Sequence, residues 1–202
     1  MPPVSSSSGG DLMSSKEIDI DEITETPFDR SYWADHEHLL AGCYPGDIDP
    51  ELARKKITYL LRYGIRHIIN LMEEGERDRY YNEFAPYEDT LKKAAESLKV
   101  DVTWSRHPIK DFGIAPPEKI REILDEIDAK ISDGKRVYVH CWGGIGRTGM
   151  IVGCYLVRHG YAEGSSVIDK IKELRANISN SFIASPESAM QKEVVKNWKF
   201  GE

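Results

Sequence analysis

Cysteine is scarce in this chain, and a long apolar run is missing. The chain has three cysteines, Cys43, Cys141 and Cys154, and no C-x-x-C pair. An odd number of cysteines without paired spacing argues against a disulfide framework or a zinc site. No apolar run approaches the roughly 20 residues that a membrane-spanning helix needs, and the N-terminus lacks the layout of a signal peptide. We therefore expect a cytoplasmic protein without metal, other cofactor or membrane span.

A surplus of basic residues is also missing. Lys and Arg number 27 against 34 Asp and Glu, which gives a net charge of −7. This balance argues against broad binding to nucleic acid or to a membrane surface. A small basic pocket can still exist inside an acidic protein, so the overall charge does not decide the ligand of a local site.

The first part of the chain has little material for a core. Residues 1–27 contain a Ser-rich, Gly-ended tract and then an acidic run without an apolar period. We expect this segment to be a disordered acidic tail. The whole chain is 40% hydrophobic, and at 202 residues it can bury one sizeable core, so residues 28–202 are expected to form one domain.

Strand-like and helix-like segments alternate through that domain. Strands are expected at 39–43, 65–72, 100–109 and 137–139, and helices from Pro50 to Gly64, at 89–98, from Pro116 to about Gly134, from the glycine loop to Gly160, and at 164–178 and 186–198. Asp49 and Ser185 are the expected caps of two of these helices. The alternation predicts an α/β fold with a central, mostly parallel sheet, helices on both faces, and ligands bound at the carboxyl ends of strands. The charged and aromatic segment 73–87 is expected to be a long surface excursion.

The most informative stretch follows the strand at 137–139. A loop with three glycines leads from this strand into an apolar helix. Backbone N–H groups in such a loop converge on one point, and the helix N-terminus behind them favours negative charge, so the loop can hold a phosphate or another oxyanion. Cys141 and Arg147 stand at its two ends in a C-x5-R spacing.

These residue types fit a nucleophilic attack on phosphorus. Amide donors and a nearby arginine lower the pKa of a cysteine, which makes Cys141 a candidate nucleophile. Arg147 can donate two parallel hydrogen bonds to phosphate oxygens, and Thr148 can donate its hydroxyl to the sulfur. The amides that would bind phosphate belong to Trp142, Gly143, Gly144, Ile145 and Gly146.

A leaving alkoxide or phenolate also needs a proton. Asp111 is the candidate general acid, because it follows the preceding strand and stands beside a possible hinge at Gly113. As a carboxylate it can accept a proton from water in a second step. Gln191 shares a helical face with Val194, Val195 and Trp198, and it is a candidate for holding that water.

The run from His140 to Gly149 resembles the H-C-x-x-G-x-G-R-T-G signature of cysteine-based protein tyrosine phosphatases. Asp111 with Gly113 and Pro116 resembles the general-acid loop of that superfamily. Segments 39–46 and 185–191 are similar to its small dual-specificity-like branch, which includes cyclin-dependent-kinase-associated phosphatases. The resemblance covers about residues 30–198. It implies a metal-independent phosphatase with a cysteinyl-phosphate intermediate and phosphorylated proteins or peptides as substrates, phosphotyrosine first and phosphoserine or phosphothreonine as possible additions.

Other functions remain open from the sequence. The same chemistry fits an inositol polyphosphate, a nucleotide or an RNA 5′-phosphate as substrate, although the loop contains no lysine. A catalytically inactive phospho-binding module and, more remotely, a sulfurtransferase are alternatives of other classes.

Several polar residues have a structural and a functional interpretation. His140 is expected to support the loop rather than to transfer a proton, and Cys43 and Cys154 are expected to be core residues. Arg106, His107 and Lys110 form either a basic rim or a solvated face. Tyr80, Tyr81 and Tyr87 of the excursion are candidates for the walls of the pocket.

Overall fold

The computed structural model of the chain describes residues 26–35, 38–78 and 80–202. The predicted tail at 1–27 lies outside these ranges except for its last two residues.

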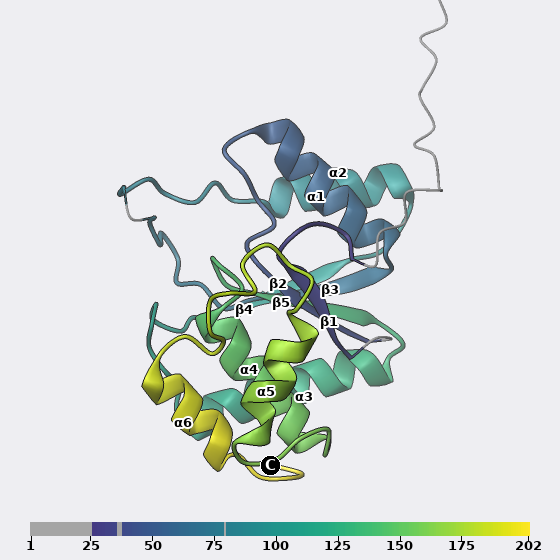
Figure 1. Cartoon of the computed structure of the whole chain (residues 1–202). Coiled ribbons are helices and arrows are strands. Elements are labelled where there is room, and N and C mark those ends of the chain that lie inside the picture. The colour runs from purple at the N-terminus through teal and green to yellow at the C-terminus, as the bar shows by residue number, and fades with distance from the viewer. Residues whose placement is uncertain (1–25, 36–37, 79) are drawn as a thin grey trace, which may run out of the picture.

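The described chain is built around one five-stranded sheet (Figure 1). The strands are β1 (Ser31–Asp35), β2 (Leu39–Gly42), β3 (Ile65–Asn70), β4 (Thr103–Arg106) and β5 (Arg136–His140), in the spatial order β1-β2-β5-β3-β4. β1 pairs antiparallel with β2, and the other three pairings are parallel. The prediction of a mostly parallel sheet is confirmed.

Two strand predictions were incomplete. β1 was not predicted, because its short S-Y-W-A-D segment becomes a strand only through the antiparallel edge pairing with β2. The strand predicted at 100–109 is limited to 103–106. Beyond its end, the amides of His107 and Ile109 still donate to Asn70 and Leu71, so this segment remains attached along β3 as it leaves the sheet.

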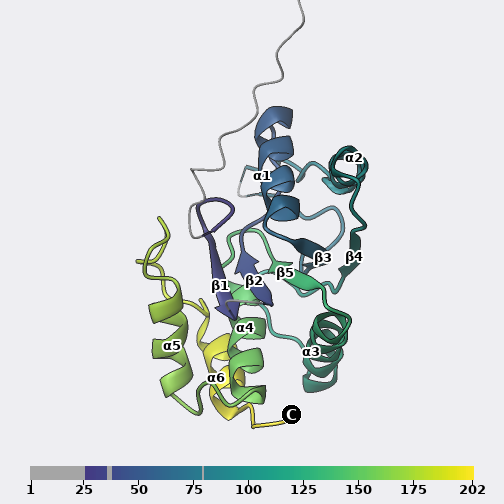
Figure 2. The ribbon, with the colours of Figure 1, turned by 90° about the vertical axis from the view of Figure 1, so that its right-hand side faces the viewer.

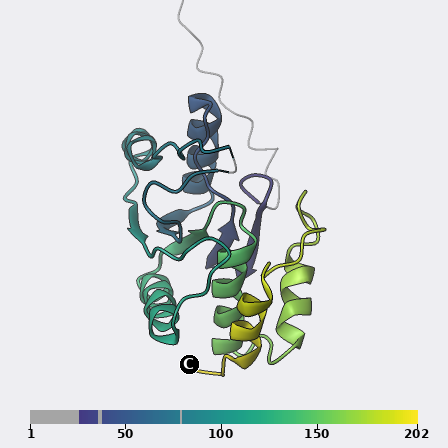
Figure 3. The ribbon, with the colours of Figure 1, turned by 90° about the vertical axis from the view of Figure 1, so that its left-hand side faces the viewer.

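Helices cover both faces of the sheet, as Figures 2 and 3 show from opposite sides. One face carries α1 (Pro50–Arg62) and α2 (Glu88–Leu98), and the other carries α3 (Pro117–Ser132), α4 (Gly146–Arg158), α5 (Ser166–Leu174) and α6 (Ala189–Asn197). Each face has its own apolar core, and the sheet separates the two. This layering leaves the carboxyl ends of β3, β4 and β5 side by side.

The two predicted helix caps had different outcomes. Asp49 caps α1, where its Oδ1 accepts the amide of Glu51 at 2.9 Å. The prediction of Ser185 as a cap was wrong, since Ser188 caps α6 and forms a reciprocal capping box with Gln191. The two serines are three positions apart and offer the same acceptor, so cap chemistry alone does not separate them.

Helix α4 lies at the centre of the lower layer. Its residues from Gly146 to Val157 are all buried, because α3, α5 and α6 surround it below the sheet. Close contact with α6 requires glycine at position 153, where a Cβ atom would lie 2.5 Å from Cγ1 of Val195. A buried helix with such restricted neighbours gives the loop at its N-terminus a fixed base.

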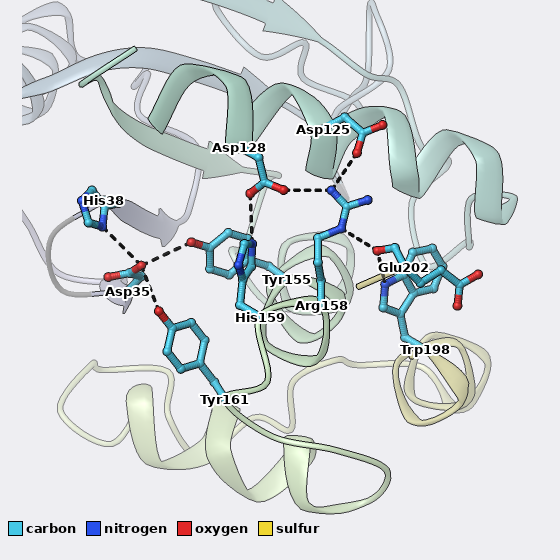
Figure 4. A network of polar contacts seen from close by, with 10 residues as sticks. All are labelled: Asp35, His38, Asp125, Asp128, Tyr155, Arg158, His159, Tyr161, Trp198 and Glu202. Atoms are coloured by element: carbon cyan, nitrogen blue, oxygen red, sulfur yellow. Dashed lines mark hydrogen bonds and ion pairs between the residues drawn. The ribbon is translucent and has the colours of Figure 1, made fainter. Parts of the chain in front are cut away.

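Polar contacts fix the far end of α4 (Figure 4). Nη1 of Arg158 lies 2.7 Å from Oδ1 of Asp125 and 2.9 Å from Oδ2 of Asp128, both on α3. The hydroxyls of Tyr155 and Tyr161 donate to Oδ2 of Asp35 at the end of β1, at 3.2 and 3.4 Å. The helix is therefore tied to a neighbouring helix and to the sheet at the end opposite the glycine loop.

None of the helices in the described ranges has the length and apolar character that crossing a membrane requires.

Candidate active site

The glycine loop connects the end of β5 to the start of α4, at the carboxyl edge of the sheet. Cys141, at its beginning, is 3% exposed, and Arg147, in the first turn of α4, is 1% exposed. The first amides of a helix have no partner within the helix. Sheet and helix thus direct a thiol, a guanidinium and free amides toward one small volume.

Four carbonyl groups of the loop are bound from outside. The carbonyl oxygens of Cys141, Trp142, Gly143 and Ile145 accept hydrogen bonds at 2.8 to 3.3 Å. Their donors are, in the same order, the ring of His140, the amide of Tyr44, the side-chain amide of Asn180 and the hydroxyl of Ser185. In a trans peptide the following N–H points away from the carbonyl, so these contacts turn the amides of residues 142, 143, 144 and 146 toward the opposite side.

Glycine is required at position 144. Its φ is +70°, and a Cβ atom there would lie 2.5 Å from the carbonyl carbon of Gly42. The left-handed conformation and the close approach of two backbones both exclude other side chains. The loop can therefore fold over the end of β2.

His140 supports the loop from below. Its Nδ1 donates to the carbonyl of Cys141 at 3.1 Å, and its Nε2 accepts from the hydroxyl of Tyr87 at 2.8 Å. Complete burial lowers the pKa of His140 to about 3, so the ring is neutral near pH 7. Tyr87 is itself buried and supports His140, and it also lines the larger of the two hollows described below. Tyr80 and Tyr81 are 74% and 81% exposed.

Glu76 holds Arg147 with a two-pronged contact that the sequence did not indicate. Oε2 of Glu76 lies 2.6 Å from Nη1 of Arg147, and Oε1 lies 2.7 Å from Nη2. Nη1 also donates to the carbonyl of Ile109 at 3.0 Å. Burial alone would lower the pKa of the Arg147 guanidinium, but the hydrogen bonds to Glu76 raise it above its ordinary value. The guanidinium is therefore charged and fixed in orientation.

Asp111 forms an ion pair with the same guanidinium, that of Arg147. Its Oδ1 is 2.9 Å from Nη2 of Arg147, and its side chain is 42% exposed. The loop that carries it follows β4 and ends at α3, so parallel strand order brings it beside the glycine loop. Cys141, Arg147 and Asp111 come from two separate loops that meet at one edge of the sheet.

Gln191 points inward, but its side-chain atoms are engaged. It is fully buried, its Nε2 donates to the carbonyl of Gly113 at 2.8 Å, and its Oε1 accepts the amide of Ser188 at 3.1 Å. Its Oε1 also lies 3.1 Å from the place where a Cβ of Gly146 would stand. The residue links the loop of Asp111 to the start of α4, and its predicted role in holding a water molecule stays a prediction.

The hydroxyl of Thr148 is buried and has no hydrogen-bond partner among residues 26–35, 38–78 and 80–202. Its expected donation to the Cys141 sulfur is likewise untested. The other two cysteines have core positions, and burial raises the pKa of their thiols, so Cys43 and Cys154 remain protonated.

The predicted basic rim is only partly present. His107 is buried and bonded to Glu126, so it cannot belong to a rim. Arg106 is engaged with the carbonyl of Met72 and with Glu88, at 3.1 and 3.3 Å. Lys110 is exposed.

The excursion after β3 lines two hollows, and the second of them includes a residue of the glycine loop. The larger, about 300 Å³, is lined by four glutamates and one arginine, with Tyr44, Phe84 and Tyr87 as aromatic walls. The second, about 210 Å³, reaches Trp142 of the loop. Rings of Phe84 and Trp142 have centroids 5.7 Å apart, which places this excursion against the loop. In the part of the chain that the structure describes, no group of three His, Cys, Asp or Glu residues is arranged to hold a metal ion.

Comparison with known proteins identifies the family to which this site belongs. Residues 45–161 match the family described as a polymorphic toxin system DSP-PTPase phosphatase. The chain belongs to this family. The matched range of this DSP-PTPase includes Glu76, Asp111 and the whole glycine loop.

Several proteins and solved structures that are similar to this chain are phosphatases by name. This chain is 25% identical over 163 residues to protein tyrosine phosphatase domain-containing protein 1 of Danio rerio. The match covers 75% of this chain but 22% of that protein. The chain is 27% identical over 143 residues to a phosphatidylglycerophosphate phosphatase of Arabidopsis thaliana, covering 70% of this chain and 54% of that protein. The chain thus spans only part of the length of these relatives.

A solved kinase associated phosphatase has the same fold. Its TM-score is 0.63 at 18% identity, over 84% of this chain and 92% of that chain. The resemblance predicted from the sequence is confirmed for the family by the DSP-PTPase match and for the fold by this structure.

Proposed function

We propose that this chain hydrolyses phosphomonoesters through a cysteinyl-phosphate on Cys141, with phosphotyrosine in proteins as the main substrate. The single observation that carries the proposal is the direction of the loop amides. Four carbonyls are bound from outside, so the amides that follow them turn to the opposite side of the loop, where we infer that the phosphate lies beside Cys141 and Arg147. Preorganised donors of this kind stabilise the charge that develops on the transferring phosphoryl group.

In the first step the sulfur of Cys141 attacks phosphorus, an S–P bond forms and the bond to the leaving oxygen breaks. Asp111 donates its proton to that oxygen, so the alcohol or phenol leaves neutral. In the second step water attacks the phosphocysteine and gives a proton to the Asp111 carboxylate. The sulfur leaves as a thiolate, which the hydroxyl of Thr148 stabilises, and inorganic phosphate is released.

Arg147 binds the equatorial oxygens of the phosphoryl group during both steps. Its Nε is buried and has no hydrogen-bond partner among the described residues, so it is available as a donor. The carboxylate of Glu76 accepts hydrogen bonds from both Nη atoms of the guanidinium. The guanidinium therefore keeps its plane when the phosphate enters, and little reorganisation is needed at the moment of reaction.

The charge around the loop favours a protein substrate over a polyphosphate. The larger hollow is lined by Glu73, Glu74, Glu76 and Glu88 and by one cation, Arg106, which is already bonded to Glu88. Such a lining repels a second or third phosphate group. The aromatic contact of Phe84 with Trp142 adds an apolar wall that suits the ring of phosphotyrosine.

We place the activity in the cytoplasm, since all three cysteines are free.

Turnover by Cys141→Ser tests the proposal. We expect this variant to lose at least about 10³-fold in hydrolysis of an aryl phosphate, because the whole covalent route is removed, while its circular dichroism stays that of the parent chain. Retained turnover would remove Cys141 as the nucleophile. In a second arm, the parent chain is offered phosphotyrosine and phosphoserine peptides, an inositol polyphosphate and phosphatidylglycerophosphate in detergent. Preference for either non-protein substrate would overturn the substrate assignment while leaving the chemistry intact.

A further inference from the structure

A buried cluster of titratable side chains lies beneath the loop that carries Asp111. The carboxylate of Glu126, on α3, lies between two imidazoles. Its Oε1 is 2.9 Å from Nε2 of His67 on β3, and its Oε2 is 2.5 Å from Nε2 of His107. His67 and His107 are 1% and 6% exposed, and the Glu126 side chain is 22% exposed. The steps proposed above make no use of these three residues.

The hydrogen-bond pattern assigns the protons of the cluster. Burial alone would raise the pKa of Glu126, but its hydrogen bond from His107 and other contacts lower it, so the group is a carboxylate and accepts from both rings. Each ring then carries its proton on Nε2. Nδ1 of His67 accepts from the hydroxyl of Thr103 at 2.7 Å. Burial lowers the pKa of His67, which keeps this ring neutral.

His107 occupies the point where the chain leaves the sheet toward Asp111. Its backbone amide donates to Asn70, and Ile109, two residues later, both donates to Leu71 and accepts from Arg147. At the other end of the loop, Gly113 is held by Gln191. The loop is therefore fixed at both ends, and the bond from His107 to Glu126 is the side-chain attachment at the first end.

We propose that Glu126, acting through the ring of His107, is a positioning residue that sets the place of the Asp111 carboxylate over the phosphate. Only three residues separate His107 from Asp111, and Pro108 stiffens that short link. The attachment of the His107 ring therefore acts together with the contacts of Ile109 to set where Asp111 lies. The inference rests on the proposed role of Asp111 as the general acid.

A matched pair of substitutions at His107 tests this inference. His107→Gln keeps an N–H donor within reach of Glu126, whereas His107→Leu removes it. Glu122→Gln is the control, because Glu122 lies 3.5 Å from Nδ1 of His107 but is 58% exposed and makes no bond to Nε2. Asp111→Asn marks the full loss of the acid. Each variant is assayed on phenyl phosphate, whose leaving group needs a proton, and on 2,4-dinitrophenyl phosphate, whose leaving group does not.

We expect His107→Leu to lower kcat on phenyl phosphate by about 10- to 100-fold, the usual cost of a misplaced catalytic group. Its kcat on 2,4-dinitrophenyl phosphate and its KM for both substrates should change less than threefold. His107→Gln and Glu122→Gln should stay within threefold of the parent chain on both substrates.

Two results would overturn the inference, namely equal losses on both substrates for His107→Leu, or a loss in His107→Gln as large as that in His107→Leu. If His107→Leu does not fold, Glu126→Gln takes its place, since its amide oxygen can accept from only one ring. It must then show the same dependence on leaving group, or the inference fails. If Asp111→Asn itself lacks this dependence while Cys141→Ser is inactive, the acid assignment falls and this inference falls with it.

Discussion

His140 is a titratable residue that the fold keeps neutral. It is completely buried, and the aromatic rings of Tyr44, Tyr87 and Tyr138 lie around it with centroids 5.5 to 5.9 Å away. The burial that lowers its pKa to about 3 also makes the folded chain reluctant to accept a proton there. A support for the phosphate loop is therefore also a source of acid sensitivity.

The free energy of unfolding should decrease as the pH is lowered, because of His140. Its folded pKa of about 3 lies below the ordinary value of 6.5, so the unfolded chain takes up the proton first as the pH decreases. The free energy of unfolding should then decline between about pH 6.5 and pH 3, and the share due to His140 between pH 7 and pH 4.5 should be roughly 2 to 3 kcal/mol. Urea unfolding across this range measures it.

His140→Asn is the matched variant for that measurement, since its side-chain amide can still donate to the carbonyl of Cys141. It should show a shallower decline of unfolding free energy with pH than the parent chain. Identical slopes in the two proteins would contradict the assignment.

At this scale, the sequence predicted residues that are marked by a local signature. Cys141, Arg147 and His140 stand where a strand, a glycine loop and a helix predict them. Glu76 was not predicted, because its partner is 71 positions away and Glu73 and Glu74 beside it have the same chemistry. Only the course of the excursion decides which of the three reaches the arginine.

Among the elements, the glycine loop is the one whose shape is most restricted. It combines a left-handed residue at Gly144 with direct contact between two backbones. The positions of four strands along the chain and the existence of the six helices followed from apolar spacing and from glycine and proline signals. The edge strand β1 and the start of α6 did not. β1 exists only through its pairing with β2, and Ser185, the expected cap of α6, instead donates to the carbonyl of Ile145, 40 positions away.

Gly144→Ala should destabilise the chain. The added methyl group would sit 2.5 Å from the carbonyl carbon of Gly42, and the residue would keep a φ of +70°, which costs about 1 to 3 kcal/mol of unfolding free energy. Gly143→Ala is the control, since its methyl group would meet only the side chain of Ile145, at 3.4 Å. Urea unfolding of both variants compares them. A loss in Gly143→Ala equal to that in Gly144→Ala would contradict this account of the loop.

The molecule as a whole is organised around α4, whose two ends have different tasks. The N-terminal end carries the phosphate loop, and the C-terminal end carries the contacts of Figure 4. Arg158 joins α4 to α3 there, and its Nε also donates to the carbonyl of Glu202. The far contacts hold the axis of the helix on which the site is built.

Arg158→Met should lower the free energy of unfolding by about 1 to 2 kcal/mol, because the Arg158 side chain is only 10% exposed and bonds three partners. The control is Arg54→Met, since Arg54 is 62% exposed and, within the described ranges, pairs with Glu51 on its own helix, a contact that solvent screens. Equal losses in the two variants, measured by urea unfolding, would show that the contacts at the far end of α4 have no special weight.

The outward carbonyls of the phosphate loop have a consequence for transplanting this chemistry. Segment 136–158 supplies the nucleophile, the guanidinium and the amides, yet three of the four donors that shape it belong to Tyr44, Asn180 and Ser185, outside that segment. If the segment alone were grafted into another strand–helix unit, the sequence motif would be present, but the loop would lack the contacts that fix its conformation. The unit that would have to be transferred is the loop together with these three donors, and they lie on both sides of it along the chain.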